Sequence, residues 1–240
     1  MSRMRKSRIA TQPDPTPPPR IPLSRERVLS AAIDLADEGG IESLTMRKLA
    51  QALGVEAMSL YNHVANKGDI VDGIVDRVIG EIELPSSVED WETAIRTCAI
   101  SANDVLLRHP WACGLVMAPV GRPTALSARV LYIEWLLGRL RGAGFPPVLV
   151  YHAYHAYHAY HALDSHILGF TLWQLGDSLP TEGLPDLAAA FLRDLPAGEL
   201  PYLVEHVNQH LAPSGVDDVS EFEFGLDLIL GGLKQARDAT

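Results

Sequence analysis

The tripeptide Tyr-His-Ala occurs four times in succession over residues 151–162, and histidine is a common metal ligand. In an α-helix each residue turns the chain by about 100°, so a period of three drifts backwards by about 60° per repeat. The four histidines therefore spiral across about half of the helix circumference and form no single stripe. A pair such as His155 and His158 would hold a metal only with further ligands. We expect no bound metal and keep a metal-sensing array as an alternative.

The sequence lacks three common catalytic patterns. It has no His-Glu-x-x-His pair, no glycine-rich phosphate loop and no Gly-x-Ser-x-Gly elbow. Its two cysteines, Cys98 and Cys113, do not form a Cys-x-x-Cys pair. We therefore expect a protein that is not an enzyme and needs no cofactor. A helical metal-dependent enzyme built on the histidine array is the less favoured alternative.

Two short helices around Gly54-Val55 have the spacing of a helix-turn-helix. Thr45 is placed to cap the first helix, and Gly54 supplies the positive φ that the tight turn needs. The second helix, expected over about 57–64, would lie in the major groove of DNA and present its early side chains to base edges. Those side chains are Ala57, Met58, Ser59, Tyr61, Asn62 and His63.

Apolar residues at helical spacing indicate an all-α protein. Ser24 is placed to cap a first helix that stops at Gly39-Gly40, and Asp69 to cap a fourth helix. We expect a disordered, basic, proline-rich arm over 1–22, a three-helix helix-turn-helix domain over 23–68, and a larger helical domain over 69–240 that opens with a connecting helix, 69–83. The further helices are expected at about 89–108, 124–142, 147–176, 184–194, 199–211 and 219–237.

Composition and charge fit a DNA-binding protein of the cytoplasm. The 240 residues are 47% hydrophobic and 21% charged, and no run of 18 apolar residues predicts a membrane span. The net charge is −10, but residues 1–80 carry eleven Lys/Arg against ten Asp/Glu, whereas 81–240 carry nine against twenty. An acidic body with a neutral-to-basic head can still bind DNA where its basic groups converge. We expect no membrane partner.

The helix-turn-helix closely resembles the DNA-binding domain of the TetR family of repressors, above all the tetracycline-repressor branch. The resemblance is carried by residues 43–55, SLTMRKLAQALGV, and 59–67, SLYNHVANK. It implies phosphate contacts for Tyr61 and Lys67, a base-reading role for Arg47, and a backbone or base contact for His63. Ala57 lacks the amide that reads adenine, so the operator should differ from the tetracycline operator. The implied DNA-contacting residues are Thr45, Arg47, Ala57, Met58, Ser59, Tyr61, His63 and Lys67.

The rest of the chain resembles the family's ligand domain more weakly, through Gly121-Arg122-Pro123-Thr124, Gly144-Phe145 and Leu168-Gly169. The resemblance implies a homodimer held by a four-helix bundle of helices 147–176 and 219–237, and an internal ligand pocket. The family's magnesium-binding histidine falls near Ala118, so a chelated tetracycline is disfavoured. The positions that match the rest of the family's pocket suit a small hydrophobic molecule. They are Met117, Leu131, Glu134, Trp135, Tyr160, Asp164 and Trp173.

The same alignment leaves about six residues too many before Leu168, and two Tyr-His-Ala units account for that excess. Six helical residues add about 9 Å and turn the flanking segments by about 120°. The sequence therefore predicts a ligand-responsive repressor with an insertion in its pocket helix. As a homodimer it would bind a pseudo-palindromic DNA operator, and a small hydrophobic inducer would release it.

Overall fold

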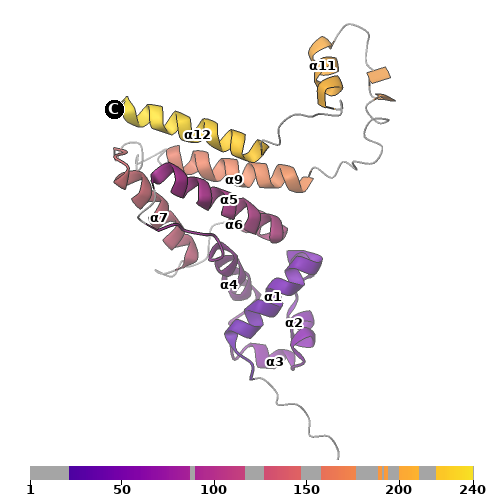
Figure 1. Cartoon of the computed structure of the whole chain (residues 1–240). Coiled ribbons are helices and arrows are strands. Elements are labelled where there is room, and N and C mark those ends of the chain that lie inside the picture. The colour runs from indigo at the N-terminus through magenta and orange to yellow at the C-terminus, as the bar shows by residue number, and fades with distance from the viewer. Residues whose placement is uncertain are drawn as a thin grey trace, which may run out of the picture.

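The described part of the protein consists of helices (Figure 1). The computed structural model describes residues 22–86, 90–116, 127–146, 158–176, 189–190, 192–193, 200–210 and 220–239, and no strand occurs among them. The all-α prediction is confirmed. The elements are α1 Arg25–Gly39, η1 Ile41–Ser43, α2 Met46–Leu53, α3 Ala57–Leu60, α4 Lys67–Ile79, α5 Trp91–Arg108, η2 Pro110–Ala112, α6 Cys113–Val116, α7 Ala128–Gly142, α9 His158–Gly176, α11 Pro201–His210 and α12 Glu221–Asp238.

Local capping explains where the first helices begin and end. The Ser24 side chain accepts a hydrogen bond from the Arg27 amide at the start of α1, and Thr45 does the same for the Lys48 amide at the start of α2. Helix α2 ends at Gly54, which lies in the left-handed region with φ 66° and ψ 35°. These boundaries agree with those predicted from the sequence.

Two predicted details of the recognition region were wrong. The third helix ends at Leu60 instead of Val64, because the amides of Asn62 and His63 bond to carbonyls three residues back and form a tighter turn. Helix α4 is capped by Asn66 and not by Asp69: the Asn66 side chain accepts from the Asp69 amide at 3.0 Å. The Asp69 carboxylate is engaged elsewhere, as described below.

One continuous apolar core runs from the head, formed by α1 to α3, through α4 into the body. Helix α4 packs against α1 and also against α5 and α7, so it joins the head to the body (Figure 1). In the body, α5 lies against α9, and α9 against α12. Any displacement of α4 in the body must therefore move the head.

Several sequence predictions fall on segments outside the described residues. These are the arm over 1–21, most of the Tyr-His-Ala array at 151–157, Met117 and Ala118, and the loop at 121–124. Helix α9 is described from His158 onward. Within the described residues, no group of three His, Cys, Asp or Glu side chains could hold a metal ion. None of the described helices is long and apolar enough to cross a membrane.

Candidate DNA-binding surface and ligand cavity

Helix α3 and the turn after it present one face to solvent and one to the core. Leu60 and Val64 are buried, as their spacing predicts. Met58 is 75% exposed and Tyr61 46% exposed, which leaves both side chains available to a partner. Ala57, Ser59 and His63 are half-buried beside them. Helix α3 and the turn after it thus leave each of these predicted DNA-facing side chains at least partly accessible.

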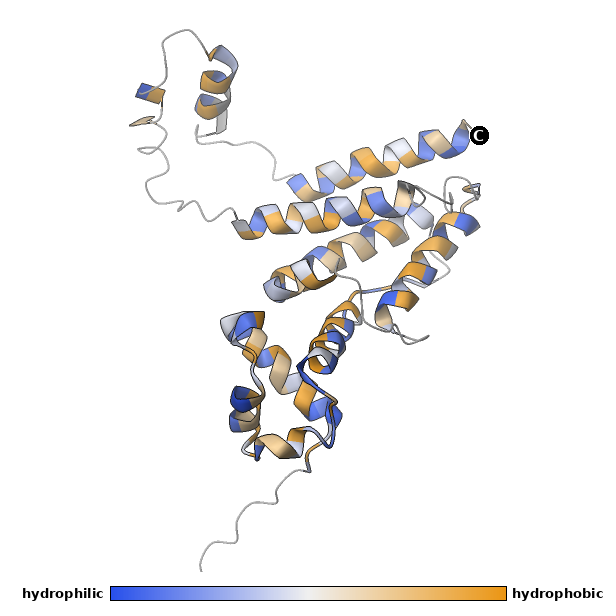
Figure 2. Ribbon diagram, turned by 180° about the vertical axis from the view of Figure 1, so that it is seen from behind, coloured by the Kyte–Doolittle hydropathy of each residue, from blue (hydrophilic) through white to orange (hydrophobic). Residues whose placement is uncertain are grey.

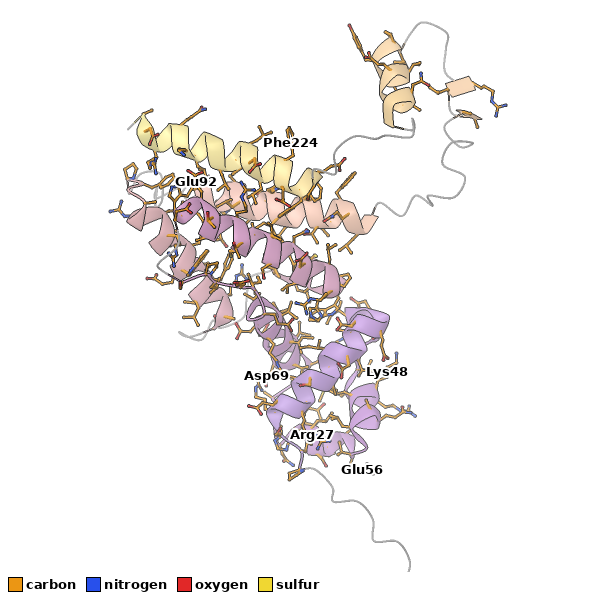
Figure 3. All side chains as sticks on the ribbon, in the orientation of Figure 1. Arg27, Lys48, Glu56, Asp69, Glu92 and Phe224 are labelled. Carbon is orange, nitrogen blue, oxygen red and sulfur yellow. The ribbon has the colours of Figure 1, made fainter. Side chains whose placement is uncertain are left out.

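Cationic side chains are exposed on the helices before and after α3. Arg47 and Lys48 are exposed on α2, and Lys67 is exposed as the first residue of α4. Figure 3 shows Lys48 pointing outward from α2. The Thr45 hydroxyl accepts the capping bond from the Lys48 amide, so its own proton stays available to a phosphate oxygen. The first amides of the 13-residue α4 add a site where a phosphate is favoured by the helix dipole.

An ion pair braces the recognition turn against the start of α1. The Arg25 guanidinium donates to both Asp69 carboxylate oxygens, at 2.9 and 2.7 Å, and to the His63 carbonyl at 3.3 Å. Asp69 Oδ2 also accepts from the Ala65 amide at 2.8 Å. The hydrogen bonds from Arg25 lower the pKa of Asp69. Sequence reasoning did not predict this brace, because its partners lie 44 positions apart.

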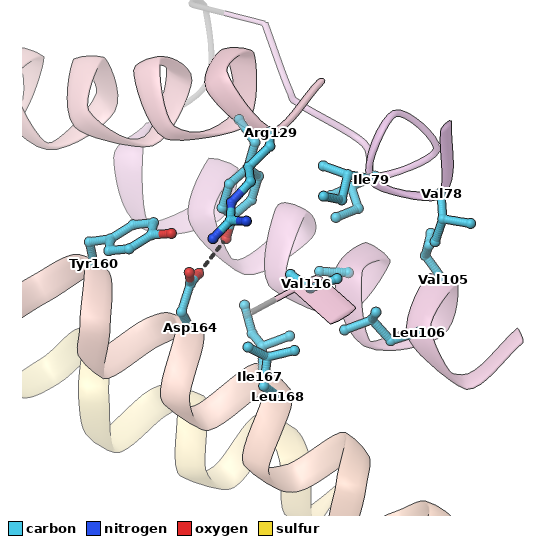
Figure 4. Close-up of a pocket in the computed structure, with 13 residues that line it drawn as sticks. Val78, Ile79, Val105, Leu106, Val116, Arg129, Tyr160, Asp164, Ile167 and Leu168 are labelled. Carbon is cyan, nitrogen blue, oxygen red and sulfur yellow. Dashed lines mark hydrogen bonds between the residues drawn. The ribbon is translucent and has the colours of Figure 1, made fainter. Parts of the chain in front are cut away.

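A narrow cavity lies where α4, α5, α6, α7 and α9 meet (Figure 4). Its volume is about 40 Å³, far below the several hundred Å³ of a typical ligand pocket. A drug-sized molecule would therefore have to push these helices apart. The lining residues are mostly aliphatic: Val78, Ile79, Ile82, Ala102, Val105, Leu106, Val116, Arg129, Tyr132, Tyr160, Asp164, Ile167 and Leu168.

A polar cluster sits at one end of this cavity. The Tyr132 hydroxyl donates to Asp164 Oδ1 at 2.9 Å, and Figure 4 shows Tyr160 and Arg129 directed toward the same carboxylate. Burial raises the pKa of Asp164, and the hydroxyls of Tyr160 and Tyr132 offset part of that rise. Burial, followed by the charge of Asp164, raises the pKa of Tyr132 well above its ordinary value. The cluster would therefore orient a polar group on an otherwise apolar ligand.

The predicted ligand residues are divided between several places. Tyr160 and Asp164 line the cavity. Glu134 and Trp135 line a separate hollow between α7 and the start of α5, where Trp135 Nε1 donates to the Pro85 carbonyl at 2.9 Å. Leu131 and Trp173 are 47% and 53% exposed, away from both hollows, and Met117 is outside the described residues.

Two polar cavity residues were missed by sequence reasoning, Arg129 and Tyr132. A signal for Tyr132 was present, because it precedes the buried Leu136 and Leu140 at intervals of four and so shares their face of α7.

Comparison with known proteins places both halves of the chain in one family. Residues 28–74 match the family model of bacterial regulatory proteins, tetR family, and residues 84–237 match the tetracyclin repressor-like C-terminal domain. The HTH-type transcriptional repressor DrrR1 of Streptomyces coeruleorubidus is 31% identical over 234 residues, covering 92% of this chain and 80% of that protein. An HTH-type transcriptional regulator of Saccharopolyspora erythraea is 39% identical over 125 residues, about half the length of each protein.

A solved structure supports the same relation. The Streptomyces coelicolor TetR family protein ActR, crystallised in complex with actinorhodin, is 25% identical and superposes with a TM-score of 0.68 over 90% of this chain and 99% of that one. Family models that together match most of the chain, and a relative that is similar over nearly all of it, agree with the helix-turn-helix and the helical body. The chain belongs to the TetR family of transcriptional regulators.

Proposed function

We propose that the protein is a repressor that binds a pseudo-palindromic DNA operator as a homodimer and is released by a small hydrophobic ligand. The observation that carries this proposal is the exposed face of α3 and the following turn, with Met58 and Tyr61 open to solvent and basic side chains exposed on the helices before and after it. As a regulator of DNA, the protein would act in the cytoplasm and would not be an enzyme.

Each DNA-facing residue has a proposed role. Tyr61, Lys67 and Thr45 contact phosphates and set the position of the head, while Arg47 reads guanine through its O6 and N7 atoms. His63, at the end of the recognition turn, contacts a base or the backbone. Ala57, Met58 and Ser59 are the remaining base readers. Because Ala57 and Met58 offer apolar contacts, thymine methyl groups are the bases that they favour.

The homodimer would form through α9 and α12. Both helices expose large apolar side chains in the isolated chain, and Figure 2 shows hydrophobic residues along each of them. Phe224 and Leu228, one turn apart on α12, are 59% and 64% exposed, and Figure 3 shows Phe224 on the outer side of that helix. Leu172 and Trp173 of α9 are each 53% exposed. Four helices from two chains would cover these faces.

Release would follow from the narrowness of the cavity. A ligand must part the helices that line it, and α4 contributes Val78 and Ile79 to that lining. Since α4 also carries the head, a filled cavity favours a different head position. Release requires that the ligand bind this second arrangement more tightly than the first, because equal affinity shifts no equilibrium. The relative ActR holds actinorhodin, so a planar aromatic molecule with polar substituents is the ligand class to test first.

The proposal is tested by footprinting the DNA upstream of the protein's own gene with purified protein. We expect protection of two half-sites about one helical turn apart, with the same base sequence in inverted order. Adding actinorhodin as a probe of ligand response should reduce the protection. Protection without sequence preference, on this DNA and on unrelated DNA alike, would contradict the proposed function.

A further inference from the structure

A carboxylate at the end of α1 binds the body of the protein. Asp37 Oδ1 accepts hydrogen bonds from His109 Nδ1 at 2.8 Å and from Trp111 Nε1 at 2.7 Å. His109 and Trp111 lie 72 and 74 positions further along the chain, at the end of α5 and in η2. Both side chains are largely buried. The head is thus held to the body by two directional bonds at one oxygen atom.

A second carboxylate extends this contact to the end of α4. Glu81 Oε2 accepts from Arg108 Nη1 at 2.9 Å and lies 3.5 Å from His109 Nε2. That nitrogen has no hydrogen-bond partner among the described residues, so the bond from Arg108 is what holds Glu81 in this cluster. The charged and titratable groups around His109 are therefore Asp37, Glu81 and Arg108. We call these residues, together with His109 and Trp111, the head clamp.

Residues of the head clamp and residues that line the cavity alternate along two stretches of the chain. On the first stretch, Glu81 lies between the cavity residues Ile79 and Ile82. On the second, the clamp residues 108, 109 and 111 lie between the cavity residues Leu106 and Val116. The cavity walls and the clamp therefore share these two stretches of backbone.

We propose that the head clamp, with Asp37 as its central acceptor, transmits occupancy of the cavity to the DNA-binding head. This inference rests on the proposed function. In the ligand-free protein the clamp fixes the head in the position that binds the operator. Parting the cavity walls moves Glu81 and the 108–111 segment away from Asp37, and the head is then free to adopt other positions. Asp37, His109 and Trp111 are positioning residues, since none of them contacts DNA or ligand.

The test compares Asp37→Ala with Asp34→Ala. Asp34 is an exposed carboxylate one turn earlier on α1, and the described residues give it no hydrogen bond or ion pair. Both variants remove one negative charge from the head, which by itself favours DNA binding slightly. We expect Asp34→Ala to bind the operator as well as the wild type or better, and Asp37→Ala to bind about tenfold more weakly. Equal or tighter binding by Asp37→Ala would overturn the proposal.

A second pair of variants tests transmission from the cavity. Ala102 is buried on α5 and lines the cavity, so Ala102→Leu presses its walls apart without any ligand. We expect this variant to weaken operator binding, and the double variant with Asp37→Ala to bind no more weakly than Asp37→Ala alone. If the double variant instead loses operator affinity by the product of the two single losses, the two substitutions act independently. The head clamp then does not transmit occupancy of the cavity to the head. If Asp37→Ala has less helical content than the wild type, Trp111→Phe replaces it in both tests. This variant loses the Nε1 donor to Asp37 and keeps an aromatic side chain.

A measurement without DNA separates this inference from the proposed function. Spin labels at position 48 in both protomers, introduced as Lys48→Cys, report the distance between the two heads. We expect a narrow distance distribution in the wild-type background and a broad one with Asp37→Ala. An unchanged distribution overturns the clamp even if the protein binds its operator. If Asp37→Ala broadens the distance distribution but the protein shows no preference for an operator, the head clamp is supported. The proposed function is then overturned.

Discussion

The Tyr132 hydroxyl on α7 donates to the Asp164 carboxylate on α9, with 2.9 Å between the two oxygens. Both residues line the cavity, so the bond joins α7 to α9 there. It gives a hydrogen-bond donor to a carboxylate that burial removes from water. Tyr132→Phe should therefore destabilise the protein by about 1–3 kcal/mol and raise the pKa of Asp164 further. Urea unfolding at fixed protein concentration measures the loss. Tyr202→Phe, on an 84% exposed tyrosine of α11, is the control, and equal stability of both variants would contradict the assigned bond.

The Arg25–Asp69 brace makes the stability of the head depend on pH. Because hydrogen bonds from Arg25 lower the pKa of Asp69 in the folded state, its stabilisation is fully present above the unfolded pKa of about 3.9 and is lost as pH falls through the folded value. Asp69→Asn should lower the free energy of unfolding by about 1 kcal/mol at neutral pH, since solvent screens this half-exposed pair. The deficit should vanish in acid. Asp72→Asn, an exposed carboxylate nearby on α4, should show no deficit.

Gly54 is required for its backbone conformation and not for space. Its φ is 66°, and a Cβ added there would meet nothing within 4 Å. Gly54→Ala should therefore cost about 1 kcal/mol through left-handed strain alone. Gly138, inside α7 and equally open, has no such conformation, so Gly138→Ala should stabilise by a few tenths up to about 1 kcal/mol. Thermal unfolding of both variants checks the opposite signs, and a shift of the same sign in both would contradict this account.

Burial should keep the two cysteines unreactive in the folded protein. Desolvation raises the pKa of the Cys98 thiol to about 12, with Asp164 and Glu83 adding to the rise, and burial also raises the pKa of Cys113. At pH 8 the reactive thiolate is therefore scarce at both positions. We expect negligible reaction with a disulfide reagent under native conditions and two thiols per chain in denaturant. Rapid reaction of the native protein would show that the body opens readily.

The sequence predicted the head well because its structure is encoded locally. The Thr45 cap, the glycine turn at Gly54 and the buried pair Leu60 and Val64 each depend on residues within a few positions of one another. Contacts over long separations were invisible to the same reasoning. The brace on Asp69 joins residues 44 positions apart, and the bonds to Asp37 span more than 70. Asp69 was predicted as a cap for that reason.

The pocket was only partly predictable because α7 has apolar residues on more than one face. Leu131 was expected at the pocket, whereas its neighbour Tyr132 lines the cavity. A shift of one residue turns a side chain by about 100°, so an alignment loose by one position selects the wrong face. Trp135 and Leu136 lie on adjacent faces in the same way, and only packing against α4 and α5 decides which is buried.

The measurement that tests the central claim most directly is fluorescence anisotropy on the protein's own upstream DNA at several salt concentrations. Wild type, Tyr61→Ala and Lys67→Ala are compared with Tyr202→Ala, which removes an exposed tyrosine outside the head. The account predicts sequence-specific binding that falls steeply with salt and is unchanged in Tyr202→Ala. It predicts weaker binding in Tyr61→Ala, and a salt slope about one unit smaller in Lys67→Ala. Equal binding to unrelated DNA, with all four proteins alike, would contradict the claim that this face reads an operator.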